Sequence, residues 1–489
     1  MSLHIIWRLA KSEYLKLVPV LALAFYVALL PHLNYPYPVH VDEWVHLASF
    51  KAMLRAHDAT FIDPFSGQLI RGLSSNLEAG FHVFWGVFHQ ISGISWLTIF
   101  KYFPGIVLII TVLSVYTMAR RQGFGWEAAL VTSLIPTTVG ILGPGFLVPV
   151  AMGLLVIPLS LFIAFNFRNR WSYVVLFIFT CFLLSIHPPT AVGLAIVLVP
   201  YILLNLKGNF KHSMGITLAM AIPFLVPFPW IFGMLLPTVK SLLGPQPPLM
   251  YVDLPHLVST YGHFPIGFCL LGIFVLAIRG RKENYGLILG FAALLLMLVA
   301  FYTFHYGVRI MYTRGLTYMV LLMSIVAGAG LMAVKNFKLP QRLSVWLRAP
   351  LITQNLGKFL CIVLIGLTLA TCIPDRQDIP YYHMIDSQDY EAFMWIKDNV
   401  NESYEKAILD PWKATAFAAT TEKYVYTRIH TAPDAEDKEA YAFLRNGCTD
   451  TAFMRENEIS IVYTQWAVNN PDLKEVRKDI YLLPKADSQ

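Results

Sequence analysis

Apolar residues dominate the first three quarters of the chain in long runs, not in the alternating patterns of soluble proteins. Eleven runs of roughly 17–25 residues are long enough to cross a hydrocarbon core about 30 Å thick as helices. Their centres lie near Leu23, Ile109, Leu134, Leu155, Phe177, Ala195, Leu225, Leu271, Leu294, Met323 and Leu364. The pattern predicts a polytopic α-helical membrane protein with about 11 transmembrane helices.

From about residue 375 the pattern becomes that of a soluble segment. A helix is expected at 391–400, followed by β-like runs at 406–410, 423–427 and 459–464 with helical patterns between them. We therefore expect a membrane module at 1–374 and a small α/β domain at 375–489. This domain has no glycine-rich phosphate loop and no metal-ligand spacing, which favours acceptor binding or support of a lid over chemistry.

The positions of Lys and Arg predict the orientation. With the N-terminus inside, 17 of the 24 basic residues before position 375 fall in cytoplasmic loops, as the positive-inside tendency requires. The first run lacks a small-residue cleavage site, which favours a helix over a signal peptide. We expect a multi-pass protein of the cell membrane, with a cytoplasmic N-terminus and an extracytoplasmic C-terminal domain.

Composition narrows the class further. Only 14% of the residues are charged, about half the share of a soluble protein, which argues against a soluble multidomain enzyme. The net charge of +7 combines a basic membrane part with an acidic C-terminal part, so it does not indicate a nucleic-acid partner. Nine of the 30 acidic residues precede position 375, and five of these nine lie between Asp42 and Glu78.

Those five acids belong to one outer loop, residues 31–95, which is long for a simple connection. Prolines fix an extended approach to Asp42, which stands where a helix N-cap is expected. Apolar residues from Trp44 to Leu54 then recur at helical spacing. We expect a helix along the membrane surface, with Asp42 and Glu43 at its N-terminal end.

A helix N-terminus favours ionised carboxylates, so the Asp42–Glu43 pair is available as a base or as a metal ligand. Plain capping is the alternative, but the scarcity of acids favours a functional role. His46, one turn further on the same face, either joins a metal or hydrogen-bond cluster or lies at the interface. Glu78 and His82 are weaker candidates for the same cleft, and a structural cap is the expected role of Glu78.

The order of these parts resembles the GT-C superfamily of integral membrane glycosyltransferases, in its prokaryotic, polyprenyl-phosphate-dependent type. The resemblance covers nearly the whole chain: a short basic N-terminus, a first span, an outer loop with the acidic motif Asp42-Glu43, further spans and a C-terminal domain on the acceptor side. The stretch EAFMWIKDNV at 391–400 also looks like the helix that opens the outer domain in many prokaryotic members.

The resemblance implies transfer of a sugar from a dolichyl- or undecaprenyl-phosphate donor to a glycan, lipid or protein acceptor at the outer membrane face. Asp42 would activate the acceptor hydroxyl or hold a divalent metal, Mg²⁺ or Mn²⁺, and Glu43 would support it. The chain lacks the longer acidic signatures and the WWDYG-type motif of oligosaccharyltransferases. This favours a transferase of single hexosyl or pentosyl units.

Such a donor places a phosphate at the membrane surface, where the leaving group gains negative charge that cations stabilise. Arg309 and Arg314 are among seven basic residues of the membrane part that are expected outside, and Arg binds phosphate in bidentate geometry. The alternative is that both end a span and snorkel to the interface. His305, in the same loop, and His187, in a tight turn between two spans, are further candidates for contact with donor or acceptor.

Two features leave alternatives open. Lys240 and Asp253 flank a proline-rich outer loop (244–248), which suits either a cover over a lipid entrance or a plain spacer. Cys372 and Cys448 both fall outside in the expected orientation, so a disulfide between them is compatible with the sequence.

Two other function classes compete with an enzyme. A polytopic transporter or flippase of a lipid-linked or anionic substrate would also need outside cations. Transporters, however, place ionisable residues near mid-membrane and show paired repeats, and the sequence shows neither pattern. The third interpretation is a structural membrane subunit whose C-terminal domain binds a partner.

Overall fold

The structure is a computed structural model of the chain and describes residues 13–71, 76–138, 141–226, 236, 254–338, 350–374, 383–429 and 432–484. Its contacts divide the chain into two compact units. Unit 1 comprises Met1–Pro36 and Thr98–Ile379, and unit 2 comprises Tyr37–Leu97 and Pro380–Gln489. The first outer loop and the C-terminal segment thus fold in the same unit. The domain boundary expected after residue 374 adjoins residues outside the described ranges and stays a prediction.

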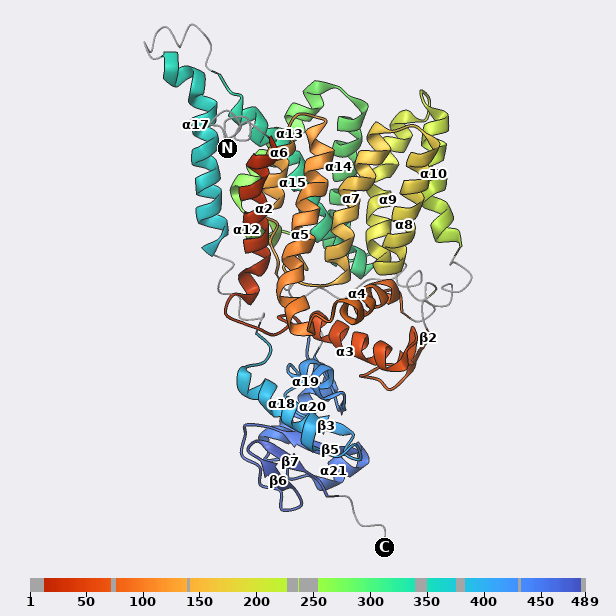
Figure 1. The fold of residues 1–489 in the computed structure, drawn as a ribbon, viewed down its shortest axis with the longest axis vertical. Helices are drawn as coiled ribbons and strands as arrows, with labels where there is room; N and C mark the ends of the chain where they lie inside the picture. Colours follow the sequence, from red (N-terminus) through yellow and green to blue (C-terminus); the bar gives the residue numbers. More distant parts are fainter. Residues whose placement is uncertain are drawn as a thin grey trace. The chain divides into compact units, whose positions relative to one another are not determined.

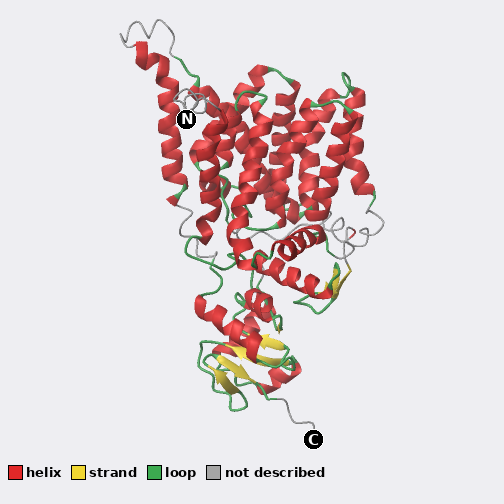
Figure 2. Cartoon of the chain, viewed as in Figure 1, coloured by secondary structure: helices red, strands yellow, loops and turns green. Residues whose placement is uncertain are grey.

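Unit 1 is a bundle of apolar helices (Figures 1 and 2). Seven helices in the described residues are long and apolar enough to cross a membrane. They are α2 (Glu13–Leu29), α5 (Trp96–Arg120), α7 (Pro149–Asn166), α9 (Pro188–Asn205), α14 (Lys282–Phe304), α15 (Arg309–Lys335) and α17 (Pro350–Cys372). Shorter helices are η1 (Leu30–His32), α6 (Gly125–Thr132), α8 (Arg170–Ile186), α10 (Phe210–Leu225), α12 (His256–Tyr261) and α13 (His263–Arg279). These helices are typical of a multi-pass membrane protein, and the orientation stays a prediction.

The run expected to span the membrane near Leu134 is not a long helix, so the count of eleven is too high for the described residues. α6 has eight residues, and the chain from 133 to 148 is non-helical wherever it is described. Prolines and glycines interrupt the helix there, yet Leu134, Phe146 and Leu147 remain buried. Irregular backbone at membrane depth is tolerated where protein encloses it. The run near Leu225 is the end of α10, beyond which residues 227–235 lie outside the described residues.

α15 is the central helix of unit 1. Its apolar window is 89% buried, and it packs against α6, α7, α9, α13, α14 and α17. A Cβ added to Gly272 of α13 would lie 2.0 Å from the Val326 carbonyl oxygen, and one added to Gly330 of α15 would lie 2.0 Å from the Phe268 carbonyl oxygen. Glycines of this kind let membrane helices meet backbone to backbone. α15 is therefore a rigid support for the residues at its N-terminal end.

The first segment of unit 2 contains the predicted loop helix, α3 (Val41–Ala56), followed by a hairpin of β1 (Thr60–Ile62) and β2 (Leu69–Arg71), and by α4 (Ala79–Ser92). The two strands are antiparallel. Ten of the sixteen residues of α3 are buried, since it packs against α4, β1 and α19 of the C-terminal segment. The predicted helix with Asp42 and Glu43 in its first turn is therefore confirmed, as a largely buried helix of unit 2, and its position along the membrane surface stays a prediction.

The second segment of unit 2, residues 383–484 and called the lobe below, is built on a five-stranded sheet of order β4-β3-β5-β7-β6. β3 (Lys406–Ile408) is parallel to β4 (Tyr424–Val425) and β5 (Ile459–Tyr463), and β7 (Ile480–Leu482) is antiparallel to β5 and β6 (Lys474–Arg477). The helices are α18 (Ser387–Asn399), α19 (Ala414–Thr421), α20 (Ala435–Arg445) and α21 (Thr451–Glu456). The three predicted strands and the helices around them are confirmed, and the β6–β7 hairpin was not predicted.

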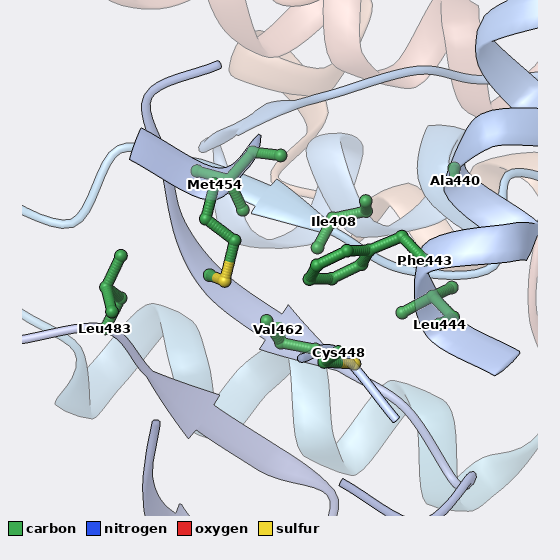
Figure 3. Close-up of a cluster of buried hydrophobic side chains, with 9 residues drawn as sticks. Ile408, Ala440, Phe443, Leu444, Cys448, Met454, Val462 and Leu483 are labelled. Carbon is green, nitrogen blue, oxygen red and sulfur yellow. The ribbon is translucent and has the colours of Figure 1, made fainter. Parts of the chain in front are cut away.

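The lobe has its own hydrophobic core (Figure 3). Phe443 from α20 and Met454 from α21 pack there against Ile408 and Val462 of the sheet, beside Cys448. Cys448 is fully buried and carries a free thiol. Cys372, in unit 1, also carries a free thiol, and its Sγ lies 3.5 Å from the Tyr261 carbonyl oxygen. The disulfide that the sequence left open is therefore not formed.

Charged side chains join α3 to the lobe. Lys51 Nζ donates to the Ala419 carbonyl oxygen of α19 at 2.7 Å, and Arg55 and Lys397 each approach Glu422 at 2.9 Å. Burial lowers the pKa of Lys51 to about 8, aided by Lys397 and Arg55 and opposed by Glu422. Burial raises the pKa of Glu422, but the three cations outweigh it and the net pKa is lowered. The outer-loop helix is thus joined to the lobe by the Lys51 hydrogen bond and by the Arg55–Glu422 ion pair.

Candidate active site

The Asp42–Glu43 pair lies in the first turn of α3. His40 keeps an extended backbone, with φ −130° and ψ 151°, and its Nδ1 accepts the Asp42 N–H at 3.1 Å. His40 is therefore the N-cap, and the expectation that Asp42 fills this position is wrong. Glu43 is fully buried, and its Oε2 accepts the N–H of Val39, the residue before the N-cap, at 2.8 Å. The cap thus uses His40 and Glu43 and does not require the Asp42 carboxylate.

His46 lies in a chain of hydrogen bonds that starts one turn after the acids. Its Nδ1 lies 3.1 Å from His82 Nε2, and Asn76 Nδ2 lies 2.9 Å from His82 Nδ1. Because the amide nitrogen of Asn76 can only donate, a neutral His82 carries its proton on Nε2 and donates to His46. Burial holds the pKa of His82 well below 6.5, and His46 acts in the same direction. This pair ties α4 to the face of α3 that carries Asp42 and Glu43.

Glu78 occupies the N-cap position of α4, but its side chain makes no capping hydrogen bond. Its carbonyl oxygen accepts the N–H groups of Phe81 and His82, and its own N–H donates to Asn76 Oδ1 at 2.9 Å. The expected capping role is therefore filled by the backbone of Glu78 and not by its carboxylate.

Arg428 of the lobe is a site residue that the sequence did not reveal. Its guanidinium carbon lies 3.8 Å from the centre of the Phe65 ring, in the turn of the β1–β2 hairpin. Burial lowers the pKa of Arg428, while the charges of Asp63 and Asp42 act on it in the opposite direction. Its Nη1 is buried and has no hydrogen-bond partner among the described residues. The fold thus brings a cation from the lobe onto the hairpin turn of the outer loop.

A second set of candidates belongs to unit 1. His187 is buried between α8 and α9, with its Nδ1 2.7 Å from Thr190 Oγ1. The same hydroxyl lies 2.9 Å from the hydroxyl of Tyr318 on α15. Arg314 precedes Tyr318 by one helical turn, so the two side chains share a face of α15. His187 therefore supports the helix that carries Arg314.

Arg309 is the first residue of α15 and is exposed, whereas Arg314 is half-buried. The N-terminal end of a helix carries partial positive charge, which disfavours cations and attracts anions. Arg309 lies in the first turn, where a cation is unfavourable for the helix, and Arg314 follows in the second turn. His305 has a positive φ of 54° and ends α14, with its N–H donating to the Phe301 carbonyl oxygen at 2.8 Å.

Some expectations have no structural counterpart. Lys240, Asp253 and the proline-rich loop 244–248 lie outside the described residues. Within the described ranges, no three His, Cys, Asp or Glu residues are grouped so that they could hold a metal ion. The Mg²⁺ or Mn²⁺ ion considered for Asp42 therefore lacks a three-ligand set in this part of the chain, and no catalytic step is assigned to a metal below.

Comparisons with known proteins show which solved structures have a similar fold. No protein-family model matches the sequence, and no curated protein matches it. The oligosaccharyltransferase of Archaeoglobus fulgidus in its apo form matches 93% of this chain and 70% of its own, with a TM-score of 0.64 and 11% identity. ArnT from Cupriavidus metallidurans bound to undecaprenyl phosphate matches 97% of this chain and 98% of its own, with a TM-score of 0.55 and 13% identity. The fold is similar to that of the GT-C glycosyltransferases.

The predicted resemblance to GT-C enzymes is thereby confirmed for the fold. The archaeal enzyme AglB in complex with an inhibitory peptide and a dolichol-phosphate also matches, over 92% of this chain and 69% of its own, with a TM-score of 0.62 and 12% identity. A further structure of the archaeal enzyme, with a TM-score of 0.57, contains zinc and sulfate. The match to ArnT extends over 97% of this chain, so it includes the outer loop and the lobe as well as the helical bundle.

Proposed function

We propose that this chain is a membrane glycosyltransferase that moves a sugar from a polyprenyl-phosphate donor to an acceptor at the outer face of the cell membrane. The observation that carries the proposal is the Asp42–Glu43 pair in the first turn of α3, in a chain with the GT-C fold. The dolichol-phosphate and undecaprenyl phosphate bound to the similar enzymes support a donor of this lipid class.

In the proposed reaction, Asp42 accepts the proton of an acceptor hydroxyl. The acceptor oxygen forms a bond to the anomeric carbon of the donor sugar, and the bond between that carbon and the phosphate oxygen breaks. The electron pair leaves with the phosphate, so the released product is the polyprenyl phosphate. A single displacement of this kind inverts the anomeric configuration. Glu43 keeps the turn in place through its hydrogen bond to Val39.

Arg309 and Arg314 are proposed to hold the phosphate as its charge grows. Preorganised cations and helix N–H groups stabilise such charge more strongly when water is excluded. His187 contributes indirectly, through Thr190 and Tyr318 on the face of α15 shared with Arg314. We further propose a cytoplasmic N-terminus and an extracytoplasmic lobe, in agreement with the distribution of Lys and Arg.

Donor cleavage by purified protein tests the proposal. Wild-type protein, Asp42→Asn and Asp58→Asn are incubated with lipid-linked sugars and an acceptor extract, and released polyprenyl phosphate is measured by chromatography. Asp58 is the control because it lies in the same loop but is exposed, and its side chain accepts the Thr60 N–H at 2.9 Å. We expect a loss of about 100-fold in Asp42→Asn and almost none in Asp58→Asn. Transbilayer movement of the donor without cleavage would support a transporter instead.

A further inference from the structure

An open cleft lies in unit 2 between the hairpin turn of the outer loop and the edge of the lobe sheet. Its volume is about 710 Å³, within the roughly 300–1,000 Å³ of small-molecule sites. Phe65, Ser66 and Gly67 form one side, and Tyr424 and Tyr426 belong to the other. Gly67 has a φ of +68°, and a Cβ there would lie 4.0 Å from the Tyr424 ring. The cleft is therefore built jointly by both segments of unit 2.

The lining indicates what the cleft can bind. Two cations, Lys406 and Arg455, offset two anions, Glu405 and Glu458, among the described lining residues. A lining without net charge selects neither an anion, such as a lipid phosphate, nor a cation. Its aromatic rings offer apolar faces, while its hydroxyls and charged groups donate and accept hydrogen bonds. A neutral ligand with apolar C–H faces and many hydroxyls satisfies both, and a saccharide is such a ligand.

The cleft fits an extended peptide less well. A peptide that adds to a sheet edge needs a run of free backbone groups, and the edge strand β4 consists of only Tyr424 and Val425. The backbone of β4 is in part already used, since the Tyr424 and Tyr426 N–H groups donate to the carbonyl oxygens of Glu405 and Ala407. Side-chain contacts must therefore dominate recognition.

Arg428 connects the cleft to the candidate catalytic acid. It stacks on Phe65, which also lines the cleft, and it carries a buried Nη1 without a partner among the described residues. A buried donor of this kind costs free energy until an acceptor pairs with it. Asp42 and Asp63 are the carboxylates whose charges reach this guanidinium. A ligand oxygen that passes Phe65 would therefore meet a buried hydrogen-bond donor.

We propose that this cleft is the acceptor site, that the acceptor is a neutral saccharide, and that Arg428, stacked on Phe65, donates a hydrogen bond to it. This inference rests on the proposed function, because it names the acceptor of the same reaction. In this proposal, the outer loop and the lobe together determine the acceptor specificity.

Photo-crosslinking in native membranes tests the inference without requiring turnover. The photoreactive residue p-benzoylphenylalanine replaces Tyr424 in the full-length protein, with the exposed Trp466 of the lobe, outside the cleft, as the control position. Ser66, which lines the cleft and is exposed in the hairpin turn, is a second test position. Adducts are identified by mass spectrometry, by their sensitivity to periodate, which cleaves vicinal diols, and by their sensitivity to protease.

We expect saccharide adducts at positions 424 and 66 at least tenfold above those at position 466. Peptide or lipid adducts, no adducts, or equal yields at all three positions would overturn the inference. Repeating the measurement with Asp42→Asn separates the two proposals. Adducts that persist while Asp42→Asn still transfers sugar would reject the catalytic role and keep the cleft. Loss of transfer in Asp42→Asn, without adducts in either background, would reject the cleft and keep the catalytic role.

Discussion

Hydrogen bonds of buried polar side chains hold the start of α3, where Asp42 lies, in place. His40 caps the helix, Glu43 reaches back to Val39, and the His46–His82 pair ties this helix to α4. Each bond is made by a side chain with little access to water, where an unpaired polar group is costly. The geometry around Asp42 is therefore coupled to the protonation of its neighbours.

Acidification provides a test at this scale. His82 has a folded-state pKa well below 6.5 because it is buried, whereas the unfolded chain binds a proton near pH 6.5. The contribution of His82 to the free energy of unfolding is therefore fully present above pH 6.5. Below pH 6.5 the free energy of unfolding decreases by up to about 1.4 kcal/mol per pH unit. Melting of purified protein between pH 7 and 5 measures this slope. We expect the pH dependence of stability to be weaker in His82→Gln and unchanged in His57→Asn, which replaces an exposed histidine. A weaker pH dependence in His57→Asn but not in His82→Gln would contradict the role of His82.

Sequence patterns identified the acidic pair but not the groups that hold it. Proline and apolar spacing sufficed to predict a helix that begins near Asp42. The N-cap was misplaced by two residues, because a histidine nitrogen can accept a backbone N–H as a carboxylate does. No pattern in the sequence marked Arg428, because its contact with Phe65 of the outer loop arises only when the lobe packs on that loop.

At the scale of elements, short segments were the hardest to predict. The charged β6–β7 hairpin lacks the apolar alternation that marks a strand. The segment after α6 is as apolar as a spanning helix, but its prolines and glycines prevent one. Long helices and central strands were predicted well, because their period is repeated often enough to outweigh single exceptions.

Because α13 packs closely on α15, we expect that even an alanine at Gly272 destabilises the protein. In Gly272→Ala the new Cβ would meet the Val326 carbonyl oxygen at 2.0 Å, so the helices must separate. We expect a loss of stability of at least about 2 kcal/mol, seen as a lower melting temperature in detergent. Gly267→Ala on the same helix has nothing within 4 Å and serves as the control. Equal melting of both variants would contradict the packing.

The ion pairs of Glu422 between α3 and the lobe predict how a substitution of Glu422 changes stability. In Glu422→Gln, Lys51, Arg55 and Lys397 lose their shared carboxylate and repel one another. We expect unit 2 to lose about 1–2 kcal/mol of stability, an effect that shrinks in high salt. Thermal unfolding at two salt concentrations measures it, with the exposed Glu436→Gln as the control. A salt-independent loss, or none, would contradict the electrostatic account.

At the scale of the whole molecule, the chain is organised as a helical bundle and as a second unit built from two distant segments. The outer loop that carries Asp42 folds with the lobe, through α3 on α19 and through the hairpin turn beside β4. Hydropathy alone separates a membrane part from a soluble part. It could not show that the outer loop and the C-terminal segment share a fold, because such pairing depends on tertiary contacts.

Removal of the lobe tests this organisation. In a chain that ends at residue 382, α3 loses its contacts with α19, although every candidate of the outer loop remains. We expect trypsin to cleave at Lys51 and Arg55 in membrane vesicles, where the full-length chain is protected, and we expect sugar transfer to be lost. An outer loop that stays protected without the lobe would show that it folds independently.

The central claim is that Asp42 acts in the chemical step of a sugar transfer from a polyprenyl phosphate. The most direct measurement is the single-turnover rate of donor cleavage in Asp42→Asn, with donor affinity measured in the same preparation. We predict a rate at least about 100-fold below wild type with an unchanged donor Kd. Cleavage at the wild-type rate by a variant that binds donor normally would contradict the account.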